Sequence, residues 1–368
     1  MRIIQLIDVY KTGGAEKVFD NFSLYCNENN IFTKCYVLYK SNYNENLPYL
    51  LDNNAKSILG KIFQQRKAIK NLRNIIESLG VERIVSFLDR SNIIAICACA
   101  KKLVRVTATV HNPPTIQYRK LGILRYLVFK ILKHFYNKSY VSVIGVSLQV
   151  KKSLEEIGVR NVRVVYNPIT ENNNSYSDIQ VNEPYFINIG RLSYQKAQWK
   201  LIKAIHILKT SYNISVSIVI VGEGELEANL KQLTKELDLQ NNVIFTGYVK
   251  NPTQLIRKSL CMIFSSFYEG FPITVLESFQ ERIPVIGTQI SLPEDVRSKI
   301  PFNRFYYENH CMEENFNPTL FEEDDYKLAE LMKIAIENEE QLRQIAEIGN
   351  RWVLENCALE NFRQYFEG

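Results

Sequence analysis

Short apolar runs alternate with amphipathic segments along most of this chain. Uninterrupted runs rich in β-branched residues indicate buried strands, and segments with apolar residues every three or four positions indicate helices. Strands are predicted at residues 2–7, 33–39, 83–87, 104–110, 141–146 and 162–166, and again at 185–190, 214–221, 242–246, 260–264 and 283–287. The alternation predicts an α/β fold with parallel, doubly wound sheets.

A polar segment divides the chain into two parts. Residues 171–178 are mostly Asn, Ser and acidic residues without an apolar pattern, which is typical of a linker. We therefore expect one domain at residues 1–170, a linker at 171–183, a second domain at 184–350 and a final helical segment at 351–368. The full length of 368 residues is sufficient for two domains that each bury a core.

The segment at residues 268–278 contains the strongest chemical pattern. It reads Tyr-Glu-Gly-Phe-Pro-Ile-Thr-Val-Leu-Glu-Ser after a buried strand, and it places Glu269 and Glu277 eight positions apart. Pro272 suits the first position of a helix, because the N–H that it lacks would have no intrahelical acceptor there. The amides of the next three residues would then face a phosphate. Two carboxylates beside a phosphate can accept hydrogen bonds from the hydroxyls of a sugar and of a ribose. The alternative interpretation is that Glu269 caps the helix and that Glu277 is a solvated helix residue.

Two further loops follow predicted strands. Gly190 ends one strand and precedes Arg191 and Lys196, two cations that can hold a diphosphate and stabilise it as a leaving group. The alternative for these residues is an ordinary solvated loop. Near the N-terminus, Gly13 and Gly14 follow the first strand and let the backbone approach a ligand, at the edge where ligands collect in parallel sheets.

These motifs together resemble those of the family 4 retaining glycosyltransferases, which have the GT-B fold with two facing Rossmann-like domains. The resemblance implies that the domain at 1–170 binds the acceptor and that the domain at 184–350 binds the nucleotide-sugar. It also implies that Glu269 approaches the donor sugar, that Glu277 binds the ribose and that the final helix crosses back to the first domain. It also places His111 near the reacting sugar, and Tyr248 and Val249 near the base. The implied donor-binding residues are Gly14, Gly190, Arg191, Lys196, Tyr248, Val249, Glu269, Gly270, Phe271, Pro272, Thr274, Val275 and Glu277. Glu269, Arg191, Lys196 and His111 are the implied catalytic residues.

The sequence also departs from the family pattern. Ala197 stands where the family has a glycine, and Glu281 and Arg282 replace a small residue and a glycine. A glycine pair downstream is replaced by the residues at 291–294. The first half of the chain adds a further resemblance. Its motif at 86–92, together with Val-Tyr-Asn-Pro at 165–168, resembles bacterial enzymes that extend lipid-diphosphate-linked glycans with hexose or N-acetylhexosamine.

The expected activity is therefore transfer of a sugar from a UDP-sugar to a glycan acceptor, lipid-linked and part of bacterial surface polysaccharide or glycoconjugate synthesis, with retention at the anomeric carbon. We expect no cofactor and no metal, because the sequence has no Asp-x-Asp motif and its four histidines are scattered. Two alternatives remain open: an epimerase or phosphorylase of the same architecture, and a catalytically silent partner subunit.

Charge is distributed unevenly. Between Asp89 and Glu155 there are no acidic residues but twelve Lys and Arg residues, which leaves the rest of the chain at a formal charge of −6 against a total of +6. Apolar residues at helical spacing accompany the cations within 101–138, so this segment is expected to contact an anionic membrane or a lipid-linked acceptor. The alternative is that the apolar stripe packs into the first domain. No nucleic-acid motif accompanies the charge.

The expected location is cytoplasmic, with peripheral contact at the inner face of the cell membrane. No apolar run reaches membrane-spanning length, and the sequence opens on a predicted strand without a signal pattern. Seven cysteines without paired metal spacing are expected to be reduced.

Overall fold

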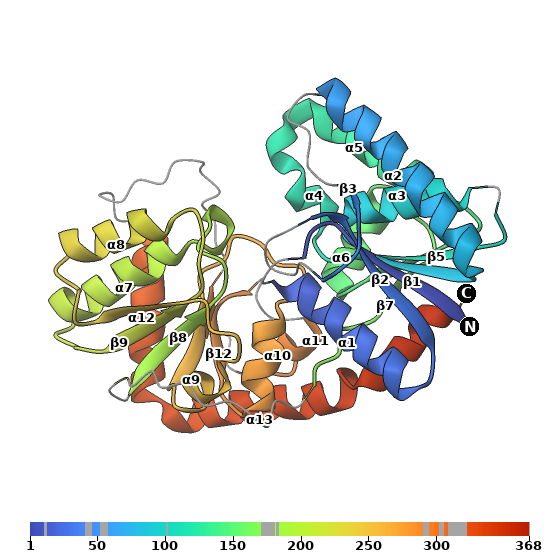
Figure 1. The fold of residues 1–368 in the computed structure, drawn as a ribbon. Coiled ribbons are helices and arrows are strands. Elements are labelled where there is room, and N and C mark those ends of the chain that lie inside the picture. Colours follow the sequence, from blue (N-terminus) through green and yellow to red (C-terminus); the bar gives the residue numbers. More distant parts are fainter. Residues whose placement is uncertain are drawn as a thin grey trace. The chain divides into compact units, whose positions relative to one another are not determined.

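The computed structural model describes residues 1–10, 13–40, 46–51, 58–100, 102–170, 181, 184–289, 294–301, 305–307 and 322–367. The chain divides into two compact units (Figure 1). Unit 1 consists of Met1–Thr170 and Ala358–Gly368, and unit 2 of Glu171–Cys357. Most of the segment expected as the linker lies outside the described residues.

Unit 1 contains a parallel sheet with the strand order β3-β2-β1-β4-β5-β6-β7. The strands are β1 (Arg2–Ile7), β2 (Phe32–Tyr39), β3 (Tyr49–Leu51), β4 (Arg83–Phe87), β5 (Arg105–Val110), β6 (Val141–Gly145) and β7 (Val162–Val164). Every strand predicted in this half is present, and β4 is buried along its whole length. The sequence pattern missed β3, because three residues are too few to show a period.

Helices connect these strands on both faces of the sheet. They are α1 (Gly14–Glu28), α2 (Ile58–Leu79), α3 (Asp89–Cys99), α4 (Pro114–Gln117), the 3-10 helix η1 (Arg119–Leu124), α5 (Arg125–Tyr136) and α6 (Leu148–Glu156). Figure 1 shows α2, α3 and α5 on one side of the sheet and α1 on the other. Helix α1 begins at Gly14, with Gly13 as the N-cap, where the sequence predicted a helix start.

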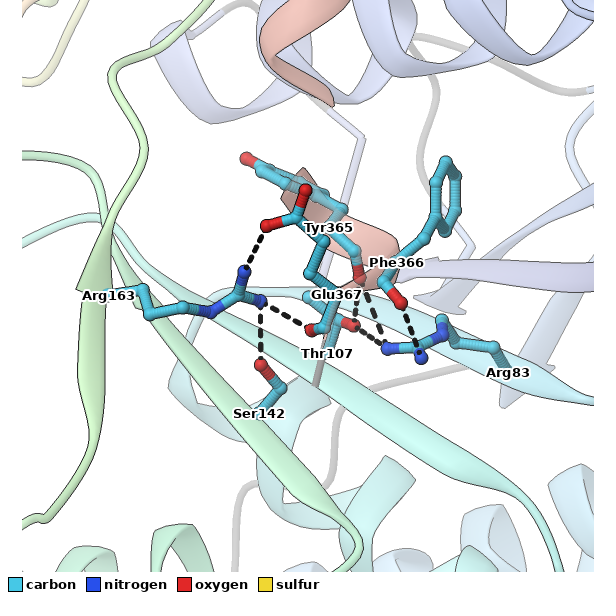
Figure 2. Close-up of polar contacts among 7 residues, drawn as sticks. All are labelled: Arg83, Thr107, Ser142, Arg163, Tyr365, Phe366 and Glu367. Carbon is cyan, nitrogen blue, oxygen red and sulfur yellow. Dashed lines mark hydrogen bonds and ion pairs between the residues drawn. The ribbon is translucent and has the colours of Figure 1, made fainter. Parts of the chain in front are cut away.

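The C-terminal end of the chain is part of unit 1. After α13 (Glu339–Asn356) in unit 2, the 3-10 helix η5 (Leu359–Phe366) packs against α1, where Tyr365 stacks on Phe22 with ring centroids 5.4 Å apart. The backbone of this segment is held by side chains of the sheet, as Figure 2 shows. Arg83 donates to the carbonyls of Tyr365 at 3.1 Å and Phe366 at 3.0 Å, and Thr107 donates to the Tyr365 carbonyl at 2.7 Å.

Unit 2 contains a second parallel sheet with the order β10-β9-β8-β11-β12-β13. Its strands are β8 (Tyr185–Ile189), β9 (Ser217–Val221), β10 (Val243–Gly247), β11 (Cys261–Phe264), β12 (Val285–Thr288) and β13 (Tyr306–Tyr307). Its helices are η2 (Tyr194–Lys196), α7 (Gln198–Ser211), α8 (Glu227–Glu236), α9 (Thr253–Arg257), α10 (Ile273–Gln280), α11 (Glu294–Arg297), α12 (Glu323–Glu337) and α13. The predicted strands are again present, and only the two-residue β13 was missed.

Helices α7 and α12 are joined by buried charges. Lys200 lies 3.1 Å from Asp324, and Lys203 lies 3.6 Å from Asp325, with all four side chains at most 4% exposed. Burying these charges is tolerable only because each has an opposite partner. The pairs fix how α12 lies on α7 and so hold the helix that follows the η2 turn.

None of the described helices is long and apolar enough to cross a membrane.

Candidate functional site

The two strongest motifs lie at the switch point of the unit 2 sheet. Strands β8 and β11 are neighbours, and the chain leaves β8 toward β9 on one side and β11 toward β12 on the other. In open parallel sheets, ligands bind beyond the carboxyl ends of the strands at this point. Residues 190–196 follow β8 and residues 265–277 follow β11, so sheet order brings two motifs together that are more than seventy positions apart in sequence.

An ion pair and several hydrogen bonds join these segments. The Lys196 ammonium lies 2.6 Å from a carboxylate oxygen of Glu269, and the two side chains are 18% and 7% exposed. Ser265 donates to the Lys196 carbonyl at 2.9 Å, and the Gln195 amide donates to the Tyr268 carbonyl at 2.8 Å. The sequence predicted separate contacts of Lys196 and Glu269 with a ligand; their contact with one another is a structural finding.

Three aromatic rings support the same turn. Phe267 lies 5.1 Å from Tyr194 and 5.8 Å from Trp199, measured between ring centroids, and its amide donates to the Gln195 carbonyl at 2.9 Å. Offset and tilted aromatic contacts of this kind add rigidity beyond the burial of apolar area. These contacts could not be predicted from the sequence, because nothing in the spacing of the three residues indicates that they meet.

Arg191 is placed by a glycine-rich turn after β9. Its guanidinium lies 3.1 Å from Glu225, and both side chains are more than half exposed. A Cβ at Gly222 would lie 2.1 Å from the Gly190 carbonyl oxygen, and one at Gly224 would lie 2.2 Å from the Leu192 oxygen. The two glycines are therefore required for the turn at 222–224 to approach the backbone at 190–192. This packing explains the Gly-x-Gly sequence, which lacks the third glycine of a dinucleotide-binding motif.

The residues expected near the base follow β10, and one of them contacts the turn at 222–225. Tyr248 and Val249 follow β10, and the Tyr248 side chain is 49% exposed. The Tyr248 amide donates to Glu223 at 3.4 Å. The turn at 222–225 thus links Arg191 and Tyr248.

Helix α10 begins one residue later than predicted. Pro272 is its N-cap, with φ −70° and ψ 120°, and Ile273 is the first helical residue. The expectation that the Val275 amide is free is wrong, because it donates to the Pro272 carbonyl at 3.1 Å. The amides of Ile273 and Thr274 belong to the first turn, where the helix itself supplies no acceptor.

The other residues of this motif are buried. Glu277 lies on α10, just over one turn from its start, and is 9% exposed. Phe271 is 6% exposed and packs edge-on against Trp352 at 5.9 Å between centroids, so its side chain anchors the loop to α13.

Both described departures from the family pattern keep a left-handed backbone. Ala197 has φ 50° and ψ 40°, and Arg282 has φ 56°. These conformations favour glycine, so the chain retains the turns at a cost of about 1–2 kcal/mol per residue. Glu281 forms an ion pair with Arg257. The remaining departure, at 291–294, falls largely outside the described residues.

Unit 1 holds the other two predicted site residues, Gly14 and His111. Gly14 is the exposed first residue of α1. His111 follows β5 and lies 3.0 Å from the Thr109 hydroxyl. Burial lowers the pKa of His111 to about 4, so the imidazole is neutral near pH 7. The ring lines a cavity of about 290 Å³ that is formed entirely by unit 1 residues.

Two family models match this chain. Residues 170–352 match the glycosyl transferases group 1 model, and residues 13–172 match the glycosyltransferase family 4 model. The chain belongs to the family 4 glycosyltransferases. Its activity is therefore that of a transferase, and its two parallel-sheet α/β units have the GT-B fold, as the sequence predicted.

Several glycosyltransferases and a solved structure are similar to this chain over most of its length. A Methanocaldococcus jannaschii glycosyltransferase is 28% identical over 79% of this chain and 80% of its own length. A Campylobacter jejuni α-1,4-N-acetyl-D-galactosaminyltransferase acting on GalNAc-α-(1→4)-GalNAc-α-(1→3)-diNAcBac-PP-undecaprenol is 27% identical over 76% of each chain. The crystal structure of Anabaena HepE in complex with UDP and glucose superposes with a TM-score of 0.76 at 16% identity, covering 99% of this chain and 98% of that one.

Proposed function

We propose that this glycosyltransferase moves a hexose or N-acetylhexosamine from a UDP-sugar to a lipid-linked glycan, with retention at the anomeric carbon. The observation that carries the proposal is the Lys196–Glu269 ion pair at the unit 2 switch point, which joins a phosphate-binding cation to a hydroxyl-binding carboxylate. Binding of UDP by HepE and the undecaprenol diphosphate acceptor of the Campylobacter relative support the choice of donor and acceptor.

Each group at the site has a role that follows from its chemistry. Arg191, Lys196 and the amides of Ile273 and Thr274 would hold the diphosphate, because they supply positive charge and free donors. An ammonium has three donors, so Lys196 can bind a phosphate oxygen while it keeps Glu269 in place. Glu269 would then accept from the donor sugar.

The remaining predicted residues complete the proposed donor site. Glu277 would accept from the ribose, and the backbone around Tyr248 and Val249 would receive the base. His111, neutral near pH 7, would donate a hydrogen bond to the reacting group.

Retention follows from attack on the face that the diphosphate leaves. The bond from the anomeric carbon to the UDP oxygen breaks, the bond to the acceptor oxygen forms on the same face, and the acceptor proton passes to the leaving phosphate. The cations stabilise the charge that develops on the diphosphate. We propose that no metal is required; within the described residues, no three His, Cys, Asp or Glu side chains are grouped to hold one.

Kinetics of an Arg191→Ala variant test this assignment. Loss of a donor to the leaving group should raise the activation free energy by about 2–4 kcal/mol, and turnover should fall accordingly. The matched control is Arg257→Ala, which removes an arginine of the same unit whose partner is Glu281. UDP release with and without a lipid-linked acceptor, and the anomeric configuration of the product by NMR, complete the test. Undiminished turnover of Arg191→Ala, or an inverted product, would contradict the proposal.

We also propose that unit 1 contacts the inner face of the cell membrane from the cytoplasmic side. The exposed apolar residues of η1 and α5 are Leu121, Ile123, Leu124, Tyr126, Leu127 and Ile131. Cations flank them, whereas Leu132 and Tyr136 of the same helix are buried and anchor it to the unit. An exposed apolar patch among cations fits an anionic bilayer surface.

Vesicle sedimentation tests this contact. The full chain should bind vesicles containing phosphatidylglycerol, and a variant with Ile123→Ser and Leu127→Ser should bind them several-fold more weakly. The control is Leu354→Ser, which changes an equally exposed leucine on α13 of unit 2. Equal binding of all three proteins would refute the assignment to η1 and α5.

A further inference from the structure

A buried lysine lies next to the turn that carries Lys196. Lys200 is the third residue of α7, and only 1% of its side chain is exposed. Its ammonium lies 3.1 Å from Asp324 and 3.4 Å from Glu322, at the start of α12. A buried ion pair is often no more stabilising than apolar side chains of the same volume. Stability alone therefore does not account for a lysine at this position.

The same ammonium also contacts an aromatic ring of the segment that follows β11. It lies 5.4 Å from the centroid of the Phe267 ring, and the Phe267 side chain is 4% exposed. The face of an aromatic ring carries partial negative charge, and its attraction for a cation is strongest where water is excluded. Lys200 therefore connects the acidic start of α12 with the segment that carries Glu269.

Phe267 aligns the two segments that meet at the Lys196–Glu269 ion pair. Its amide donates to the carbonyl of Gln195, the residue before Lys196, at 2.9 Å. Phe267 itself stands two positions before Glu269 in the sequence. A displacement of its ring would shift one segment against the other and lengthen the 2.6 Å contact between Lys196 and Glu269.

A second buried pair on the same two helices is a reference for a purely structural role. Lys203 lies 3.6 Å from Asp325, and the two side chains are 2% and 1% exposed. Lys203 stands three positions after Lys200, almost one turn further from the η2 turn. Both pairs join α7 to α12, and the pair at Lys200 in addition contacts Phe267.

We propose that Lys200 is a positioning residue of the donor site. Held by Asp324 and Glu322, it fixes the Phe267 ring and so keeps Lys196 and Glu269 in register. Its ammonium is buried, so it acts through Phe267 and not on the substrate. The identity of the ligand rests on the proposed function, whereas the placement of the segment at 265–269 does not.

Hydrogen exchange of the full chain, followed by mass spectrometry, tests the placement. The variant combines Lys200→Met with Asp324→Asn, which removes the cation together with the carboxylate that it would leave unpaired. Exchange in peptide 265–270, relative to the β8 peptide 185–189, should rise about fivefold, because a desolvated cation–π contact is lost. The β8 peptide corrects for unfolding of the whole unit.

The matched control combines Lys203→Met with Asp325→Asn. It removes an equally buried pair between the same helices and should leave the exchange ratio of the two peptides as in the wild type. A rise of the ratio in this control equal to that in the Lys200 variant would overturn the proposal, because any weakening of the α7–α12 contact would then suffice.

Calorimetric titration with UDP tests the consequence for binding. The dissociation constant should rise about fivefold in the Lys200 variant and stay unchanged in the Lys203 control. Phe267→Leu keeps apolar bulk but removes the face of the ring, so it should weaken UDP to a similar extent. Added to the Lys200 variant, it should weaken UDP no further, because both changes break the same contact.

The results separate this proposal from the proposed function. If the wild type does not bind UDP, the donor assignment fails, and the exchange ratio alone decides the role of Lys200. If the wild type binds UDP, an unchanged exchange ratio, an unchanged UDP affinity or additive effects of the two changes would overturn the proposal. Should the Lys200 variant not fold, wild-type exchange and UDP affinity in Phe267→Leu would overturn it.

Discussion

Removing the Lys196 side chain should destabilise unit 2 strongly, although Lys196 lies in the three-residue helix η2. Lys196→Ala would leave the Glu269 carboxylate, 7% exposed, without its cation at 2.6 Å. Loss of one member of a buried pair costs about 3–5 kcal/mol. Because Lys196 keeps 18% of its side chain exposed, we expect about 3 kcal/mol.

The chain offers a matched control at the same distance. Lys231 and Glu227 also lie 2.6 Å apart, but their side chains are 55% and 34% exposed on helix α8. An exposed pair of this kind contributes about 0.3–0.5 kcal/mol, so Lys231→Ala should change stability little. Burial, and not distance, is then the cause of the difference.

Urea denaturation followed by tryptophan fluorescence measures the effect. Both tryptophans, Trp199 and Trp352, lie in unit 2, so the signal reports the unfolding of that unit. Adding Glu269→Gln to Lys196→Ala removes the orphaned charge and should recover about 1–2 kcal/mol. A Lys196→Ala cost below about 1 kcal/mol, or strictly additive effects in the double variant, would refute the reasoning.

Three further outcomes are expected. Gly222→Ala should lower unit 2 stability by about 2–3 kcal/mol in the same assay, because its Cβ would lie 2.1 Å from the Gly190 oxygen; an unchanged urea midpoint would contradict this. Arg83→Ala should speed proteolysis of the C-terminal segment, since it removes two hydrogen bonds to Tyr365 and the next residue, together about 2–3 kcal/mol; equal digestion rates would count against it. His111 has a folded pKa of about 4 against about 6.5 unfolded, so protonation of the unfolded state should reduce stability as pH falls from about 6.5 to 4. His111→Gln should lose less stability than the wild type over this range by circular dichroism, and identical pH profiles would exclude the assignment.

The predicted strands were found because each is a local pattern. Runs such as residues 260–264 are apolar throughout, and a strand buried on both faces requires this whatever its neighbours are. The helix start at Gly14 was equally local. The short strands β3 and β13 were missed because two or three residues carry no period.

Site chemistry was only partly visible in the sequence. The resemblance made Arg191, Lys196, Glu269 and Glu277 candidate site residues, and they stay a prediction. It did not predict the contact between Lys196 and Glu269. The apolar residues expected at helical spacing within 101–138 do not share one environment, since Leu132 is buried whereas Leu124 is 66% exposed. Spacing gives the face of a helix and does not show where its neighbours stop.

The sequence by itself determined the order of strands and helices, the parallel α/β class and the family motifs, because these depend on residues close together in the chain. Only the tertiary structure decided which donors each carboxyl group meets. Asp8 and Asp89 are eighty-one positions apart, and the sequence does not predict their partners. The pairing of β1 with β4 sets both beside the same cavity, where Ser91 donates to Asp8 and two tyrosines donate to Asp89.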